Sequence, residues 1–197
     1  MSIHPIEVES YRILEGRVDL SHHDPFVAAV IARTIHATAD LDFAGSMRVT
    51  RDAVEAGVEA IASGAPVIVD VEMVRAGITA HETVCCLRDV AVAPDGWTRS
   101  AAAMRVAAER HPEGAIVVVG CAPTALVEAV RLVDADELAP ALLIGVPVGF
   151  VGAAEAKDRA HFAPVPSITN IGEKGGSAVA AAVLNAVVSL QPTNGRR

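Results

Sequence analysis

The sequence predicts an α/β fold with three layers, in which a mainly parallel, doubly wound and flavodoxin-like sheet lies between two layers of helices. Three stretches, residues 66–71, 115–119 and 141–144, are apolar and β-branched on successive positions. Such runs are typical of strands that are buried on both faces of a parallel sheet. Helical patterns at residues 100–110 and 124–133 separate them, and this alternation indicates βαβ units.

The first third of the chain is predicted to be largely helical. One helix starts with Asp24 as its N-cap and Pro25 at the first helical position, and apolar residues then recur every three or four positions. Residues 10–14 could start a shorter helix before it. A second amphipathic pattern at residues 50–63 ends at Gly64, a residue type that commonly stops helices.

Two shorter stretches, residues 83–87 and 165–169, complete a predicted sheet of five strands. In open α/β sheets, ligands bind beyond the carboxyl ends of the strands. This rule selects four loops that hold most of the unusual residues of the chain: residues 70–77, 120–124, 145–152 and 170–177. The second and the last of them are either ordinary glycine turns or turns that aim backbone N–H groups at a carboxylate or phosphate.

Bulk composition indicates one soluble domain. A length of 197 residues and 52% hydrophobic content suit a single core, so we expect one domain over residues 1–190 and a disordered tail over residues 191–197. The formal net charge of −8, without any run of lysine or arginine, argues against nucleic acid or an anionic membrane as the main partner. An anionic ligand must therefore meet a local basic pocket.

The cysteines and the N-terminal residues favour a cytoplasmic location. Cys85, Cys86 and Cys121 have neither the even number nor the spacing of a disulfide framework or a zinc site. The start of the chain lacks a basic segment followed by an apolar run, and no uncharged apolar stretch of about 18 residues occurs. No metal site is expected, because the adjacent His22 and His23 lack a second pair of ligands.

His36 is the residue whose surroundings best suit catalysis. It falls in or near the last turn of its predicted helix, where the helix dipole favours a cation, and Asp40 would lie one turn further on if the helix persists. Both effects favour the imidazolium, so we interpret His36 as a general acid. The alternative is a histidine that only caps the carbonyl groups at the helix end.

Other patterns are less specific. The glycine spacing in residues 145–152 and 172–177 fits neither a dinucleotide-binding loop nor a P-loop, and no G-x-S-x-G nucleophile elbow is present. Asp70 and Glu72 are separated by one residue at a strand end. They need not face each other, so they do not make a convincing acid/base pair. Arg99, at the head of a predicted helix, opposes the local dipole, which indicates either an anion-holding role or a solvated surface arginine.

Six segments, in this order, resemble the precorrin-8X methylmutase family of cobalamin biosynthesis: RTIHAT at residues 33–38, GAPVIVDVEMV at 64–74, TRSAAA at 98–103, GCAPTAL at 120–126, GVPVGFVGAAEAK at 145–157 and KGGS at 174–177. The similarity spans nearly the whole chain. One departure is Cys121, where relatives usually have asparagine, and this puts a side-chain hydrogen bond at that position in doubt.

The resemblance implies a cofactor-independent isomerase that moves a methyl group from C-11 to C-12 of precorrin-8X to give hydrogenobyrinate, or acts on the cobalt analogue. It implies that His36 is the proton donor, that Ser10 and Arg99 hold the tetrapyrrole substrate, and that a homodimer places both sites at its interface. The other candidate substrate-binding residues come from the predicted loops and their neighbours: Asp70, Thr124, Lys157, Lys174, Gly175, Gly176 and Ser177.

Two alternatives remain open at this point. One is a non-catalytic corrinoid-binding protein with the same fold. The other is an α/β enzyme that acts on a phosphorylated metabolite through the glycine-rich loops.

Overall fold

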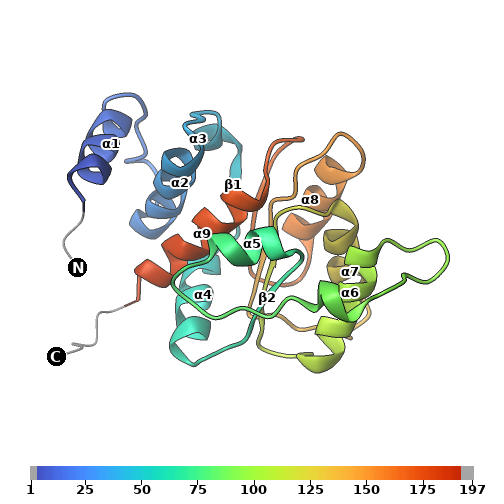
Figure 1. The fold of residues 1–197 in the computed structure, drawn as a ribbon. Helices are drawn as coiled ribbons and strands as arrows, with labels where there is room; N and C mark the ends of the chain where they lie inside the picture. The colour runs from blue at the N-terminus through green and yellow to red at the C-terminus, as the bar shows by residue number, and fades with distance from the viewer. Residues whose placement is uncertain (1–3, 192–197) are drawn as a thin grey trace.

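A computed structural model describes residues 4–191 and has helices on both faces of a five-stranded sheet (Figure 1). Four strands are parallel and buried: β2 (Val67–Val69), β3 (Ile116–Val119), β4 (Leu142–Gly145) and β5 (Ser167–Asn170). The fifth strand, β1 (Met47–Val49), pairs antiparallel with β5 and forms one edge. The mixed α/β class with a mainly parallel sheet is therefore confirmed.

Several details of the predicted sheet differ from the structure. The prediction of a strand at residues 83–87 is wrong, because only Val84 forms a bridge, to Ile68, before the 3₁₀ helix Cys86–Asp89. Strand β1 was not predicted. The flavodoxin-like arrangement is not confirmed. The strand order is β1-β5-β4-β3-β2, in which β2 to β5 are consecutive neighbours and β1 lies beside β5, whereas a flavodoxin-type sheet has the order 2-1-3-4-5.

One face of the sheet is covered by a buried, alanine-rich helix, α9 (Ser177–Ser189). Helix α2 (Pro25–Thr38) packs on the outer side of α9, and α4 (Ala53–Ala62) and α5 (Glu72–Gly77) flank it. The side chains of α9 are mostly alanine and valine, so α2 can pack closely against α9. Asp24 caps α2 as predicted, because its carboxylate accepts the Phe26 N–H at 2.8 Å.

The opposite face is covered by α6 (Arg99–Arg110), α7 (Pro123–Asp134) and α8 (Ala153–Phe162). Helix α1 (Pro5–Glu15) lies outside α2 at one end of the molecule, and the short α3 (Phe43–Ser46) connects α2 to β1 (Figure 1). Within residues 4–191, no helix has the length and apolar character needed to cross a membrane.

Candidate functional site

The carboxyl ends of the four parallel strands define the edge at which the candidate residues lie. Asp70 follows β2, Gly120 follows β3, and the glycine-rich loops follow β4 and β5. The C-terminal end of α2 leads to the same edge, because β1 is antiparallel to β5 and Met47, its first residue, pairs with Asn170, the last residue of β5. The fold therefore brings residues from both ends of the chain to one edge of the sheet.

His36 lies in the last turn of α2, as predicted, and is half-buried under α1. The hydroxyl oxygen of Ser10 is 2.7 Å from its Nδ1 atom. The ring of Tyr11 stacks on the imidazole with 4.9 Å between the ring centroids and an angle of 13° between the planes. Nε2 is left as the ring nitrogen without a hydrogen-bond partner among the described residues. This arrangement suits proton transfer through Nε2.

Asp40 does not extend the helix that carries His36, and that expectation was wrong. Helix α2 ends at Thr38, and Ala39 adopts the left-handed conformation with φ 55°. The carboxylate of Asp40 instead accepts a hydrogen bond from Nζ of Lys174 at 2.7 Å. This bond lowers the pKa of Asp40 below its usual range. The side chains that contact His36 directly thus come from α1.

The loops after β4 and β5 are joined by backbone contacts. The Gly176 N–H donates to the Val146 carbonyl at 2.9 Å, and the Gly149 N–H donates to the Glu173 carbonyl at 3.1 Å. A Cβ atom on Gly175, which has φ +152°, would lie 2.2 Å from the Val146 carbonyl oxygen. Glycine is therefore required there by close approach as well as by conformation.

Both lysines of the predicted site make internal contacts. Lys157 is 1% exposed, and its ammonium donates to the Lys174 carbonyl oxygen at 2.6 Å and to Oδ1 of Asn170 at 3.3 Å. Burial lowers the pKa of Lys157 to about 8, against the attraction of nearby acidic groups. The Lys174 side chain is exposed and donates to Asp40 and to Asp42, at 2.7 and 2.6 Å. Neither geometry leaves an ammonium unengaged for a ligand.

Asp70 is buried and accepts three backbone N–H groups in the turn after β3. They belong to Gly120, Cys121 and Ala122, at 3.1, 2.8 and 2.8 Å. Burial raises the pKa of Asp70, while these hydrogen bonds act in the opposite direction. An internal carboxylate thus occupies the N–H groups that were expected to bind an external anion. The side chain of Cys121 takes no part in these bonds, and burial raises the pKa of its thiol.

Arg99 and Thr124 lie where the N-termini of α6 and α7 meet. The Thr124 hydroxyl is 2.7 Å from that of Thr98, the N-cap of α6. Arg99 is exposed and donates from Nε to the Val90 carbonyl at 3.0 Å and from Nη2 to the Leu87 carbonyl at 3.0 Å. Its Nη1 group and its positive charge remain available, since no carboxylate of the described residues lies within ion-pair distance of it.

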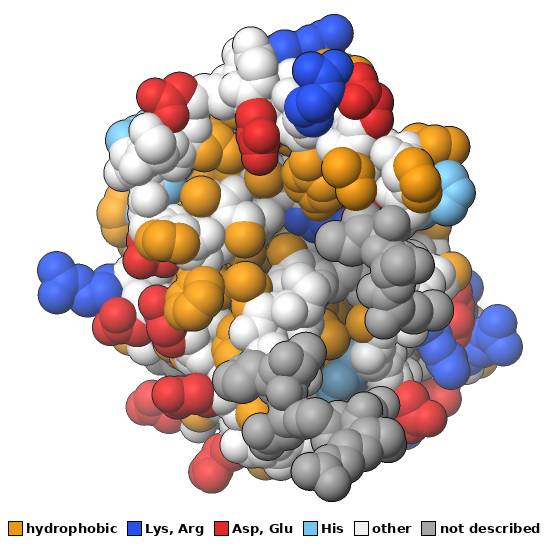
Figure 2. Space-filling view, turned by 90° about the vertical axis from the view of Figure 1, so that its left-hand side faces the viewer, with side chains coloured by type: hydrophobic (Ala, Val, Ile, Leu, Met, Phe, Trp, Pro, Cys, Tyr) orange, Lys and Arg blue, Asp and Glu red, His pale blue; other side chains and the backbone are white. Residues whose placement is uncertain are grey.

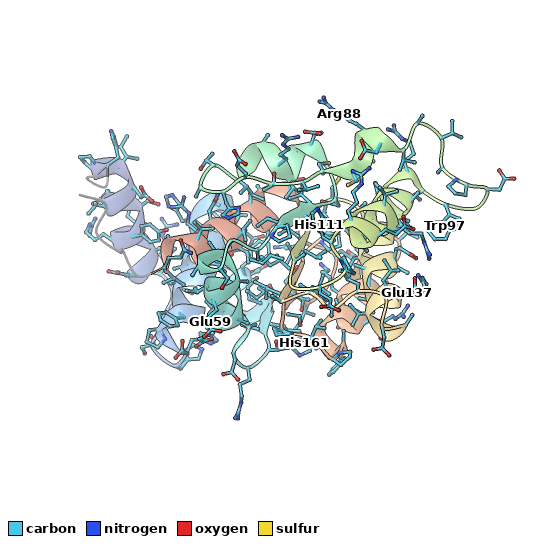
Figure 3. All side chains as sticks on the ribbon, turned by 90° about the horizontal axis from the view of Figure 1, so that it is seen from below. Glu59, Arg88, Trp97, His111, Glu137 and His161 are labelled. Carbon is cyan, nitrogen blue, oxygen red and sulfur yellow. The ribbon has the colours of Figure 1, made fainter. Side chains whose placement is uncertain are left out.

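The two ends of the candidate site are well separated in one chain. Trp97, two residues before Arg99 in sequence, lies at the opposite side of the molecule from α1, which carries Ser10 (Figure 3). Figure 1 shows α5 and α9 between these two sides. The structure therefore brings Ser10 to His36 and Arg99 to Thr124. It also brings Lys157 to the loop before α9, which contains Lys174, Gly175 and Gly176 and leads to Ser177. It does not bring Arg99 to His36 in the same chain.

Exposed apolar side chains surround this edge, a feature that sequence analysis did not identify. Phe150 and Val151, in the loop after β4, are 90% and 88% exposed. Met73 and Ile171, after β2 and β5, are exposed as well. Helix α1 adds Ile6, and Figure 2 shows hydrophobic side chains gathered among charged ones on that side of the molecule. The sequence signals for these loops were their place after predicted strands and the glycine-rich residues 145–152 and 172–177.

No group of three or more potential metal ligands occurs among residues 4–191. The rings of His22 and His23 lie near each other, with their centroids 4.1 Å apart. The three cysteines are free thiols.

Comparisons with known proteins identify the family to which the chain belongs. A profile of the precorrin-8X methylmutase family matches residues 5–190. The cobalt-precorrin-8 methylmutase of Methanocaldococcus jannaschii is 42% identical over 164 residues, which cover 81% of this chain and 78% of that protein. The precorrin-8X methylmutase of Pseudomonas aeruginosa is 37% identical, with 92% of each chain covered.

The fold is shared with a solved structure. Precorrin-8X methylmutase from Thermus thermophilus superposes with a TM-score of 0.85 at 38% identity, and the superposition covers 94% of both chains. Because similarity extends over nearly the full length in both sequence and structure, the chain belongs to the precorrin-8X methylmutase family.

Proposed function

We propose that this chain is an isomerase that moves a methyl group from C-11 to C-12 of precorrin-8X to give hydrogenobyrinate, or that performs the same step on the cobalt analogue. The environment of His36 carries the proposal. Ser10 engages Nδ1 and Tyr11 stacks on the ring, so the imidazole is held with Nε2 directed to a ligand. Family membership supplies the substrate class.

His36 is the proton donor in this mechanism. With the ring protonated, Nδ1–H donates to the Ser10 oxygen and Nε2–H faces the substrate. Donation of the Nε2 proton to the macrocycle lowers the barrier as the methyl bond at C-11 breaks and the bond at C-12 forms. The proton returns to the imidazole of His36 when the product is released. Because the reaction is an isomerisation, it needs no net redox change and no water, only a bound shape and a proton donor.

Arg99 is the cation best placed to hold a substrate carboxylate. Lys174 is paired with two carboxylates and Lys157 is buried, whereas Arg99 has donors and charge available. The remaining loop residues, Thr124, Gly175, Gly176 and Ser177, would line the macrocycle, and Asp70 would shape their edge. The exposed apolar groups after β4 suit the flat, largely apolar face of a tetrapyrrole.

A homodimer with its sites at the interface accounts for the separation of Arg99 from His36. In such a dimer, His36 of one protomer would face Arg99 of its partner across one macrocycle. The exposed apolar residues of α1 and of the loop after β4 would then be covered. We also infer a cytoplasmic location and one domain that includes residues 1–190, in keeping with the free thiols.

The test is conversion of precorrin-8X by the wild type and by His36→Ala. Absorbance spectra, which distinguish these isomers of equal mass, should show that conversion falls by at least about a hundredfold, the loss typical of a general acid. Binding of hydrogenobyrinate should remain. The control is His111→Ala, at the far end of α6 from this edge, which should convert substrate normally.

Other outcomes would support the alternatives. Unimpaired conversion by His36→Ala would exclude the proton-donor role. Product binding without any conversion by the wild type would indicate a corrinoid carrier. A thermal shift with nucleotides but none with hydrogenobyrinate would favour an enzyme acting on phosphorylated metabolites.

A further inference from the structure

Lys157 and Lys174 are the only lysines among the 16 basic residues of the chain, and both act on the loop between β5 and α9. Nζ of Lys157 donates to the main-chain carbonyl of Lys174 at 2.6 Å. The same carbonyl accepts a hydrogen bond from Nδ2 of Asn170 at 2.8 Å. Oδ1 of Asn170 accepts a second hydrogen bond from Nζ of Lys157 at 3.3 Å. One carbonyl of the loop thus receives a buried ammonium and a buried amide.

The side chain of Lys174 is held from the other side of the sheet. Its ammonium bonds to Asp40 and Asp42 in the segment that follows α2. Lys157 belongs to α8, which covers the opposite face of the sheet from α2. Lys174 therefore joins the two helical layers at the ligand edge, and Asp40 is four residues from His36.

A buried ammonium at position 157 is unfavourable for folding alone. Burial lowers its pKa to about 8, although Asp158 on the same helix and Glu173 in the loop attract its charge. A methionine would fill a similar volume without this penalty. What only the ammonium supplies is a pair of charge-assisted hydrogen bonds, one to the loop and one to Asn170 at the end of β5. Such bonds are roughly twice as strong as neutral ones.

We propose that Lys157 is a positioning residue for His36. Its ammonium fixes the loop after β5, and Lys174 transmits that position to Asp40 and Asp42. Asp40 in turn holds the last turn of α2, because its N–H donates to the hydroxyl of Thr38 at 3.3 Å. Deprotonation of Lys157 weakens the first link, so the loop and the rate should change together as the pH rises through about 8. The kinetic part rests on the proposed function.

Because the chain has two lysines, the titration of each lysine side chain can be measured directly in the whole protein. Protein labelled with ¹³C at the lysine Cε atoms gives two side-chain NMR signals, which Lys157→Met and Lys174→Met assign. The Lys157 signal should titrate near pH 8, and the Lys174 signal should shift with the same midpoint because the loop loosens. Titration of Lys157 at its ordinary pKa, or a Lys174 signal that does not respond, would overturn the proposal.

The kinetic readout is the pH dependence of precorrin-8X conversion. The wild-type kcat should fall with the midpoint found for Lys157 by NMR. Lys157→Met should lower kcat at least about tenfold at pH 7, with little change in KM, and should lose the alkaline fall. Arg159→Gln, an exposed change two residues along the same helix, is the matched control and should keep both rate and profile.

The remaining outcomes test either the positioning role of Lys157 or the proposed function. A wild-type kcat in Lys157→Met would refute the positioning role. If that variant does not fold, disagreement between the NMR and kinetic midpoints of the wild type would refute it instead. If the wild type converts no precorrin-8X at any pH, the proposed function fails, and the coupling of the two lysine signals still tests the positioning of the loop.

Discussion

The hydroxyl of Ser10 lies 2.7 Å from Nδ1 of His36, and this contact between α1 and α2 leaves Nε2 as the ring nitrogen without a partner among the described residues. The ring of Tyr11 packs on the same imidazole and limits its rotation. A single turn of α1 therefore supplies both the hydrogen bond and the stacking surface for the candidate proton donor.

Ser10→Ala should lower kcat/KM for precorrin-8X by roughly tenfold, because a hydrogen bond of about 1–2 kcal/mol no longer orients the ring. Steady-state kinetics measure this effect. Ser63→Ala, which removes an exposed hydroxyl bonded to the Glu59 carbonyl at the end of α4, should leave kcat/KM unchanged. Equal kinetics for Ser10→Ala and wild type would show that Ser10 does not orient His36.

Asp70→Asn should lower the free energy of unfolding by about 1–3 kcal/mol, because an amide NH₂ group would face N–H groups that now donate to a carboxylate. Urea denaturation measures the change. Asp136→Asn, at an exposed position with φ 56° that asparagine tolerates, is the matched control. Equal stability of the two variants would mean that the turn after β3 does not depend on Asp70.

Gly175→Ala should be more destabilising than Gly172→Ala. Both glycines have positive φ, but a Cβ atom at position 172 meets open space, whereas at position 175 it would collide with the Val146 carbonyl. We expect a loss of about 1–2 kcal/mol from conformational strain at position 172 and a larger loss at position 175. Similar losses would show that the loop after β4 can move away.

Lys157→Met should be as stable as the wild type at pH 7, or more stable. The folded-state pKa of Lys157, about 8, lies below its ordinary value, so the charged form is penalised by folding. This penalty, on the order of 3 kcal/mol, is present below pH 8 and disappears as the pH rises towards the ordinary value. The lost hydrogen bonds offset part of it.

Denaturant unfolding of both proteins from pH 7 to pH 10 measures this difference. The unfolding free energy of the wild type should rise relative to that of Lys157→Met over the alkaline part of the range. A wild type that is several kcal/mol more stable at pH 7, or a difference that does not change with pH, would contradict the prediction.

Sequence reasoning succeeded where the signal is local. Buried parallel strands such as residues 115–119 consist of successive β-branched residues, and the capping of α2 by Asp24 needs only neighbouring positions. Strand β1 was missed because its three residues gain their partner from β5, about 120 positions later. The alternation that identifies longer strands cannot appear in so short a segment.

The contacts of the candidate site are mostly non-local, which limited their prediction. The bonds of Asp70 reach residues 50 to 52 positions away, and those of Lys174 to Asp40 span 134 positions. The position of His36 at a helix end was predictable, whereas its partner Ser10 entered through family resemblance. Asp40 was assigned to His36 because the end of α2 at Thr38 carries no glycine signal.

Helix α1 rests chiefly on α2 and contributes only Leu14 to the two clusters of buried side chains that pack against the sheet. Only Leu14 of this helix is buried, so little apolar surface opposes its detachment. Local unfolding of α1 can therefore precede global unfolding, and it would strip His36 of both its hydroxyl partner and its aromatic neighbour. Inactivation by mild heating or limited proteolysis near residues 16–24 should then set in while the sheet is still intact.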